Sequence, residues 1–247
     1  MTIYSIFVIF LAVVVFSLSL NVFLKNKEHS NRAFAFTLSM IGMWILSVGL
    51  SNLFFDIDTG ISALSVRFSY FFGTMVAFAF FYFSLTYADN YKPTALLRRF
   101  LFGNSLFIFI FYFYKDLASL FSVGVQEDMI VTTVYKTMEG SLGWYSGKYI
   151  VFFFIFFFGT FSAALATLWQ KYQKQTEERL QKQTLFVFWV ITAGAVPSGF
   201  LNTILPWFGI FDYVWMGVVL TTGWVITIWY WMFRFEKNNA EMPNVLK

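Results

Sequence analysis

The residues of this 247-residue chain that could bind a ligand lie near the ends of long apolar segments. Ser198 and Asn202 are four positions apart, so they share one face of a helix. If that face points inward, a pocket could form in which Arg67 pairs with Asp212 or binds an acidic ligand. The candidate ligand-binding residues are Asn52, Arg67, Trp144, Tyr145, Ser198, Asn202 and Asp212. The alternative is that the charged and aromatic members are anchors in the membrane interface.

Catalytic and cofactor chemistry find no support in the sequence. The chain has no cysteine, and its one histidine, His29, lies in a short connection without an evident partner. We find no motif for a nucleophile or a metal site. The centres of the apolar segments contain no ionisable residue, which argues against a proton pump. We therefore expect no enzyme, no cofactor and no metal, and the last apolar segment has no lysine for a retinal Schiff base.

Seven apolar segments predict an all-α membrane protein. Each is about 20 residues or longer, the length of helix that crosses a hydrocarbon core of roughly 30 Å. A mean hydropathy of +0.67 and a charged fraction of 12% fit this class. The expected spans are residues 2–24, 33–55, 68–88, 100–121, 149–169, 184–205 and 213–233.

Basic residues predict the orientation of the bundle. Cytoplasmic connections retain Lys and Arg, and an outer N-terminus leaves only Arg67, Lys115, Lys136 and Lys148 of 17 basic residues outside. We therefore expect the N-terminus outside and the C-terminus inside. The net charge of +4 then reflects inner connections that meet membrane lipid, and no partner of the nucleic-acid class is implied.

Two connections are longer than the others. Residues 129–135 are rich in β-branched and aromatic residues, and residues 138–141 resemble a turn before Leu142. This pattern predicts an outer β-hairpin between the fourth and fifth helices, either a shield for helix ends or a lid over a ligand. Residues 171–183 contain no Gly or Pro, so the fifth and sixth helices are expected to protrude as a solvated hairpin.

The sixth segment contains a predicted hinge. Pro197 removes a backbone hydrogen bond, and Gly194 and Gly199 beside it could ease a bend. Such a kink could convert occupancy at the outer face into displacement at the inner face, or it could serve packing alone. In the fifth segment, Gly159 and Ala163 form a small-residue face for contact within the bundle or between two protomers of a homodimer.

Motifs in order along residues 3–234 resemble the N-terminal seven-transmembrane sensor region of bacterial histidine kinases. They are Trp44, Arg67, the run from Phe80 to Tyr87, Gly143-Trp144 with Tyr149, Gln183, Pro197 and Asp212. The resemblance implies a sensing module in the inner (cytoplasmic) membrane whose last helix drives a cytoplasmic effector. The chain departs from that pattern after Arg234, where residues 235–247 contain no histidine box and no nucleotide-binding motif.

These observations together predict a membrane receptor or sensor. Residues 1–234 are expected to form the sensor domain and residues 235–247 a short cytoplasmic tail. A small molecule or peptide would bind outside or within the membrane, and the sixth and seventh helices would act on a signalling partner or a fused output domain. The alternatives are a transporter or permease subunit and a membrane scaffold, which the seven-helix architecture does not separate.

Overall fold

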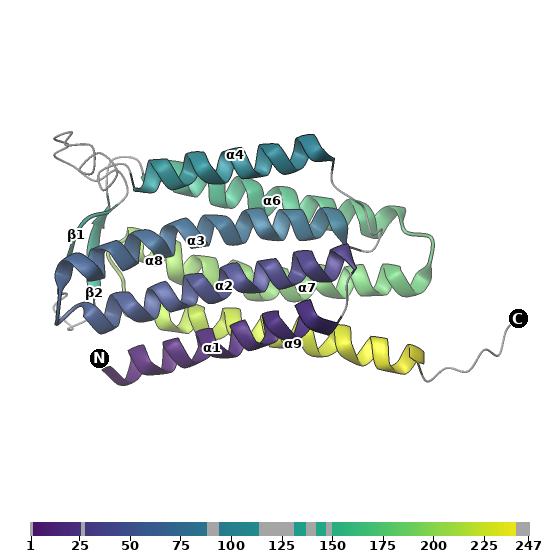
Figure 1. Ribbon diagram of the computed structural model, residues 1–247, viewed down its shortest axis with the longest axis horizontal. Helices are drawn as coiled ribbons and strands as arrows, with labels where there is room; N and C mark the ends of the chain where they lie inside the picture. Colours follow the sequence, from purple (N-terminus) through teal and green to yellow (C-terminus); the bar gives the residue numbers. More distant parts are fainter. Residues whose placement is uncertain are drawn as a thin grey trace, which may run out of the picture.

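The computed structural model describes residues 2–25, 28–87, 94–113, 131–136, 142–146 and 150–240. Within them, long helices run roughly parallel to one axis and form an elongated bundle (Figure 1). The N-terminus and two short strands lie at one end of the bundle, here called the hairpin end, and the C-terminus lies at the opposite end. The helices and strands are α1 (Thr2–Lys25), α2 (His29–Phe54), α3 (Thr59–Thr86), α4 (Ala95–Tyr112), β1 (Val131–Lys136), β2 (Leu142–Ser146), α6 (Ile150–Lys174), α7 (Glu178–Gly199), the π-helix η1 (Phe200–Ile204), α8 (Leu205–Trp207) and α9 (Val214–Ala240).

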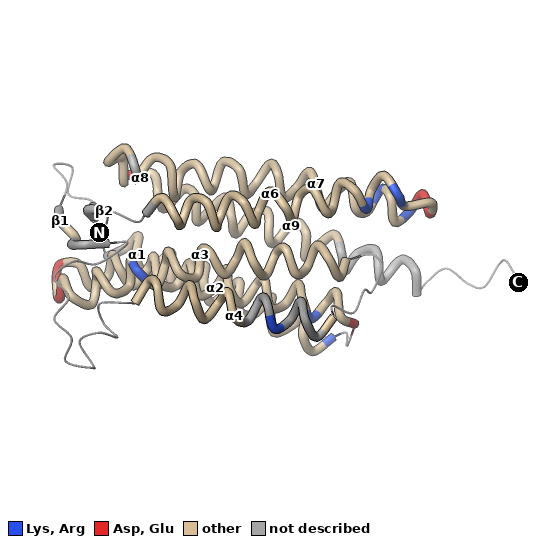
Figure 2. The backbone as a smooth tube through the Cα atoms, turned by 90° about the horizontal axis from the view of Figure 1, so that it is seen from above, with Lys and Arg blue, Asp and Glu red and all other residues tan. Residues whose placement is uncertain are grey.

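The chain is a multi-pass helical membrane protein. Among the described residues, six helices are long and apolar enough to cross a membrane, and α4 contributes a shorter apolar segment, Gly103–Tyr112. Charged residues gather toward the two ends of the bundle, and the length between them is largely uncharged (Figure 2). This distribution is expected of helices whose middle parts lie in hydrocarbon, because a charge there is costly.

Several predicted spans have different bounds in the structure, and the third and fourth spans show why. The segment predicted at residues 68–88 begins nine residues earlier, at Thr59, because Asp58 caps the helix. Its Oδ1 accepts hydrogen bonds from the backbone N–H groups of Gly60 (2.8 Å) and Ile61 (3.1 Å). The segment predicted at residues 100–121 is helical from Ala95 to Tyr112 and turns at Phe113, while residues 114–121 lie outside the described part.

The connection between α6 and α7 is short because both helices continue past the apolar segments. α6 extends to Lys174 and α7 begins at Glu178, so only three residues separate them. Lys182 forms an ion pair with Glu178 at 2.5 Å, four residues earlier on the exposed surface of α7. The predicted helical hairpin over residues 171–183 is therefore present.

The two strands pair antiparallel and pack against the helices. Val134 of β1 lies opposite Trp144 of β2, and Lys136 lies opposite Leu142. Val134 and Leu142 are buried in a cluster with Tyr70 of α3 and Phe153 of α6, whose rings meet edge to face at 4.8 Å. The strands thereby cover the hairpin end of the helices. The turn predicted at residues 138–141 lies outside the described part.

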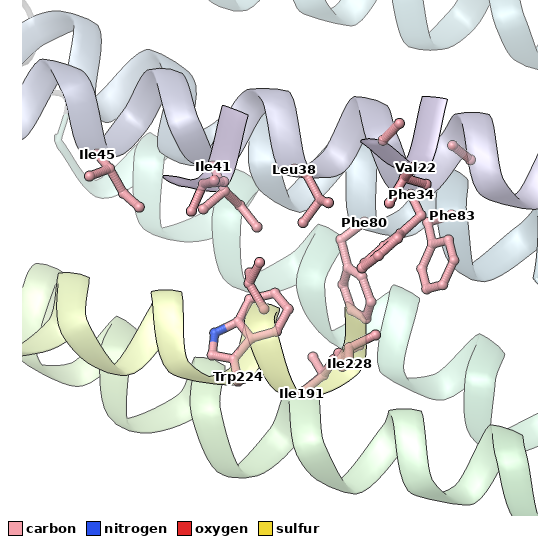
Figure 3. Packing of buried hydrophobic residues seen from close by; sticks show 14 of the residues in the cluster. Val22, Phe34, Leu38, Ile41, Ile45, Phe80, Phe83, Ile191, Trp224 and Ile228 are labelled. Atoms are coloured by element: carbon pink, nitrogen blue, oxygen red, sulfur yellow. The ribbon is translucent and has the colours of Figure 1, made fainter. Parts of the chain in front are cut away.

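The main core joins α1, α2 and α3 to α6, α7 and α9. Leu38 and Ile41 of α2 are fully buried and face Phe80, Ile191 and Trp224 from the surrounding helices (Figure 3). More than half of the α2 and α3 spans is buried, compared with less than a third of the α1, α6 and α7 spans. α2 and α3 therefore form the centre of the bundle, and the other helices present apolar side chains to lipid.

Candidate ligand-binding site

A cavity of about 440 Å³ lies inside the bundle toward the hairpin end. This volume is within the range of sites that hold small molecules. Its wall is built by α1, α2, α3, α6, α7, η1 and α9, and Leu142 of β2 contributes to it. Aromatic residues form much of the apolar surface: Tyr4, Trp44, Tyr70, Phe80, Phe153, Phe157, Phe161, Phe211, Trp215 and Trp224.

Four of the seven predicted ligand-binding residues line this cavity. They are Asn52 of α2, Ser198 of α7, Asn202 of η1 and Asp212, which precedes α9. Ser198 and Asn202 are adjacent on the wall, as their spacing predicts, and the Asn202 Nδ2 donates to the Ser198 carbonyl at 2.8 Å. The structure therefore brings together groups from the second and sixth predicted segments and from the connection before the seventh.

Arg67 does not contribute to the described lining. The sequence reading placed it at the start of a helix, but the earlier start of α3 puts it more than two turns inside. Its side chain is only 8% exposed, so it is not an anchor in interfacial water. Its neighbours Val66, Ser69 and Tyr70 do line the cavity.

The two predicted residues of the hairpin are placed only by their backbone. Trp144 and Tyr145 lie in β2, where they pair with Val134 and Thr133 of β1. Their side chains are outside the described part of the structure. β2 reaches the cavity through Leu142, which is 3% exposed.

A π-helical turn shapes the wall between α7 and α9. Over Phe200–Ile204 the helix is widened, and the N–H of Leu205 donates to the carbonyl of Phe200 five residues earlier. Pro206 follows directly and has no N–H for the carbonyl four residues before it, which favours a break in the α-helical pattern. π-turns of this kind frequently mark functional sites. Here the turn carries Asn202, so it sets the position of a polar group of the cavity.

α8 ends in a glycine turn. The N–H of Ile210 donates to Leu205 O at 3.0 Å and that of Gly209 to Pro206 O at 2.9 Å, the bonding pattern of a Schellman motif. Gly209 has a φ of +80°, a conformation that L side chains rarely adopt. This tight turn sends the chain back toward the cavity, where Phe211 and Asp212 join the lining.

Two glycines set the contact between α7, η1 and α9. Gly194 of α7 lies directly under Trp224 of α9, whose Cβ is 2.5 Å from the position a Cβ at Gly194 would occupy. Gly217 of α9 lies under Asn202 of η1, with Cγ 2.5 Å from the corresponding position. Gly194 therefore makes room for Trp224 of α9, and Gly217 makes room for Asn202 of η1.

The three residues of the predicted hinge have different roles in the structure. Pro197 lies inside α7, just before the π-turn. Gly194 makes room for Trp224, whereas Gly199 lines the cavity, and a Cβ at Gly199 would lie 3.9 Å from its nearest neighbour, Phe157 Cε1. The interpretation of Gly194 as a residue that eases a bend missed this packing contact.

Sequence reasoning missed Trp224. This residue is 9% exposed, lines the cavity, and its Nε1 is buried without a hydrogen-bond partner. The available signal was its position in the middle of an apolar segment, since tryptophan in membrane proteins concentrates at the interfaces. A central tryptophan that directly follows Gly223 and lies seven residues after Gly217 indicates an interior, closely packed site.

The cavity is poor in ionisable groups. Asp212 supplies a carboxylate, and none of the described lining residues is Lys, Arg or His. Among the described residues, no group of three or more His, Cys, Asp or Glu side chains is placed to hold a metal ion. The arrangement is suited to binding a largely apolar molecule with a few polar atoms. No protein-family model matches the chain, and no curated protein matches its sequence.

Proposed function

We propose that this protein is a membrane receptor that binds a small molecule in the cavity and transmits its occupancy through α7 and α9. The observation that carries the proposal is that the cavity touches both partners of the α7–α9 contact. Asn202 and Trp224 line the cavity, and the same two side chains rest on Gly217 and Gly194 of the opposite helix. A ligand that moves either side chain acts directly on the contact between the two helices.

The output would leave the bundle along α9. This helix begins beside the cavity and continues to Ala240 at the end opposite the hairpin. Contacts at glycine leave little free space between the helices, because protein interiors are close-packed. A displacement at Trp224 is therefore expected to shift α9 relative to α7, and the shift would reach a cytoplasmic signalling partner or a fused output domain. Two packings with different ligand affinity suffice for this mechanism.

In the proposed orientation the hairpin end faces outward. Asp56 and Asp58 lie at this end, whereas the far end carries basic residues on α1, α2, α6 and α7, among them Lys25, Lys174 and Lys182 (Figure 2). The excess of basic residues at the far end supports a cytoplasmic location for the C-terminus. The strands would then cover the cavity from the outer side as the proposed lid.

The sensor type is proposed on the resemblance to the seven-transmembrane input region of bacterial histidine kinases. Trp44, one of the residues that carry the resemblance, lines the cavity beside Gly73. Pro197 and Asp212 flank the π-turn in the chain, and Asp212 lines the cavity. The proposal accordingly includes the inner membrane as location and a kinase or similar protein as output.

A cavity-filling substitution tests the receptor mechanism without a known ligand. Gly73 of α3 lines the cavity, and a Cβ there would have ordinary contacts of 3.8 Å with Phe153 and Trp44. Gly73→Leu should therefore occupy the cavity as a ligand would. Gly159→Leu on α6 is the matched control, since no neighbouring atom lies within 4 Å of its Cβ position.

The readout is the distance between spin labels on α7 and α9. Because the chain has no cysteine, labels can be placed at Lys182→Cys and Tyr230→Cys, both well exposed. Gly73→Leu should change this distance by about 1–2 Å, the scale of helix shifts in switching proteins. A reference pair at Leu24→Cys and Arg32→Cys on α1 and α2 should not change. Equal distances in Gly73→Leu and Gly159→Leu would refute the receptor mechanism.

The π-turn η1, which interrupts the α-helical hydrogen bonding of this span, also favours a second candidate, a transporter, because interrupted helices form midmembrane substrate sites. The two functions differ in access to the cavity. We expect Gly73→Cys to react with a membrane-impermeant thiol reagent from the outer side only. Labelling from both sides would instead support alternating access and a transport function.

A further inference from the structure

We propose that the cavity binds an elongated, uncharged amphiphile that donates a hydrogen bond to Asn202 and accepts one from Trp224. This inference deepens the proposed function, since it concerns the same cavity and rests on that cavity being the ligand site. Three features of the cavity support it: polar groups without a hydrogen-bond partner, the charge of the lining residues, and the different positions of Asn202 and Trp224 along the bundle.

Several hydroxyl groups of the wall present lone pairs rather than hydrogens. Five of them donate their hydrogen to a main-chain carbonyl of their own helix at 2.7–2.9 Å, and these are Thr37, Ser51, Ser69, Ser198 and Thr221. A hydroxyl has one hydrogen and two lone pairs, so each of these oxygens can still accept. The polar part of the wall therefore matches a ligand that carries hydrogen-bond donors.

Trp224 supplies the complementary donor. Its side chain is more than nine-tenths buried, and its Nε1 has no hydrogen-bond partner. In Figure 3 the nitrogen lies on the edge of the indole ring that faces away from Phe80 and Ile228. A buried N–H without a partner is costly, because it has lost its bond to water without replacement. An acceptor atom on a ligand in the cavity would remove that cost.

Asn202 supplies an acceptor at a second place. Its Nδ2 is bonded to Ser198 O, whereas its buried Oδ1 has no hydrogen-bond partner. Asn202 rests on Gly217, which precedes Trp224 by seven residues on α9. With a rise of 1.5 Å per residue, Gly217 and Trp224 are about 10 Å apart along the axis of α9. The two polar groups are therefore attached at different levels of the bundle, which an elongated ligand can span.

The charge of the described part of the wall disfavours an anionic ligand. The described lining contains no Lys, Arg or His, and Asp212 contributes a carboxylate. A carboxylate or phosphate in this cavity would lose its hydration without a cationic partner. The acidic ligand that the sequence suggested for Arg67 is therefore not expected here. The aromatic residues of the wall instead suit an uncharged apolar body.

The test compares three probes of equal chain length: 1,8-octanediol, 1-octanol and octanoate. When extended, the diol places its two hydroxyls at a separation close to the spacing of Gly217 and Trp224 along α9. Binding is measured by isothermal titration of the full chain in nanodiscs, with empty nanodiscs as the blank for partitioning into lipid. We expect the diol to bind at least tenfold more tightly than octanoate and more tightly than 1-octanol. Failure of the diol to bind, or octanoate binding as tightly, would overturn the inference.

Variants assign the two hydrogen bonds. Trp224→Phe keeps an aromatic ring but removes the N–H, and it should weaken the diol about tenfold, to the affinity of 1-octanol. Asn202→Leu should do the same by removing the amide oxygen. Trp189→Phe, on a side chain that is 56% exposed, is the control and should leave all three affinities unchanged. Unchanged diol affinity in both cavity variants would overturn the inference.

The outcome is separable from that of the receptor test. If Gly73→Leu shifts α9 but the diol does not bind, the ligand class is wrong and the receptor mechanism stands. If the probes bind in the expected order but no cavity filling moves α9, the ligand chemistry stands and the receptor mechanism is wrong.

Discussion

Replacing Gly194 by alanine should destabilise the bundle through one defined contact. A Cβ at this position would lie 2.5 Å from the Trp224 Cβ and closer still to two atoms of its ring. Carbon atoms in contact are normally separated by 3.5–4.0 Å, so a gap of roughly 1 Å must be opened. The indole ring could rotate, but the Trp224 Cβ is fixed to the backbone of α9. The helix itself must therefore retreat from α7.

The expected loss in the free energy of unfolding is about 1–3 kcal/mol, the usual effect of overpacking a well-packed interior. Gly223→Ala on α9 is the matched control, because no atom lies within 4 Å of its Cβ position. The control should be neutral or stabilising by up to about 1 kcal/mol from helix propensity. Both variants can be unfolded with SDS from mixed micelles and followed by circular dichroism. Equal stability of the two variants would refute the assigned α7–α9 contact.

Three further predictions concern the ends of α3 and the last turn of α7. Lys171→Met should lower the free energy of unfolding in SDS by about 1.5–3 kcal/mol, because the Lys171 Nζ donates to Leu85 O (2.8 Å) and Tyr87 O (2.7 Å) at the end of α3. Lys174 is exposed, so Lys174→Met should be neutral. Equal stability of the two variants would contradict the assigned hydrogen bonds. Asp58→Ala should cost about 0.5–2 kcal/mol by loss of the α3 cap, with Asp58→Asn close to wild type, and a stable alanine variant would contradict the capping role. Pro197→Ala should reduce the change in α7–α9 label distance caused by Gly73→Leu without affecting membrane insertion, and an undiminished change would remove the hinge role.

The long helices could be predicted from the sequence because length and hydropathy are local properties. Bounds failed where a polar residue rather than hydropathy decided them. Asp58 starts α3 well before its apolar segment, so the sequence reading put Arg67 at a helix start when it is buried inside the helix. The sequence does contain a signal for this helix start, an aspartate followed by Thr-Gly, but the prediction followed hydropathy instead.

The cavity could be predicted only in part. The four-residue spacing of Ser198 and Asn202 correctly placed them on one face, because helix geometry alone determines it. The contacts of Gly194 and Gly217 depend on which helix lies opposite, and no local pattern contains that information. The unsatisfied Nε1 of Trp224 is likewise a property of the packed bundle, and only the central position of this residue in its apolar segment was visible in the sequence. The π-turn at η1 precedes Pro206, whose missing N–H favours a break in the α-helical pattern but does not by itself specify a π-turn.

Filling the cavity should move α9 relative to α7, and a graded series of side chains at position 73 is the decisive experiment for this mechanism. Label distances between positions 182 and 230 should be measured for Gly73, Gly73→Ala and Gly73→Leu in nanodiscs. We predict a progressive change with side-chain size, reaching about 1–2 Å in the leucine variant, while the α1–α2 reference distance stays constant. An α7–α9 distance that is the same in all three proteins would contradict the receptor mechanism.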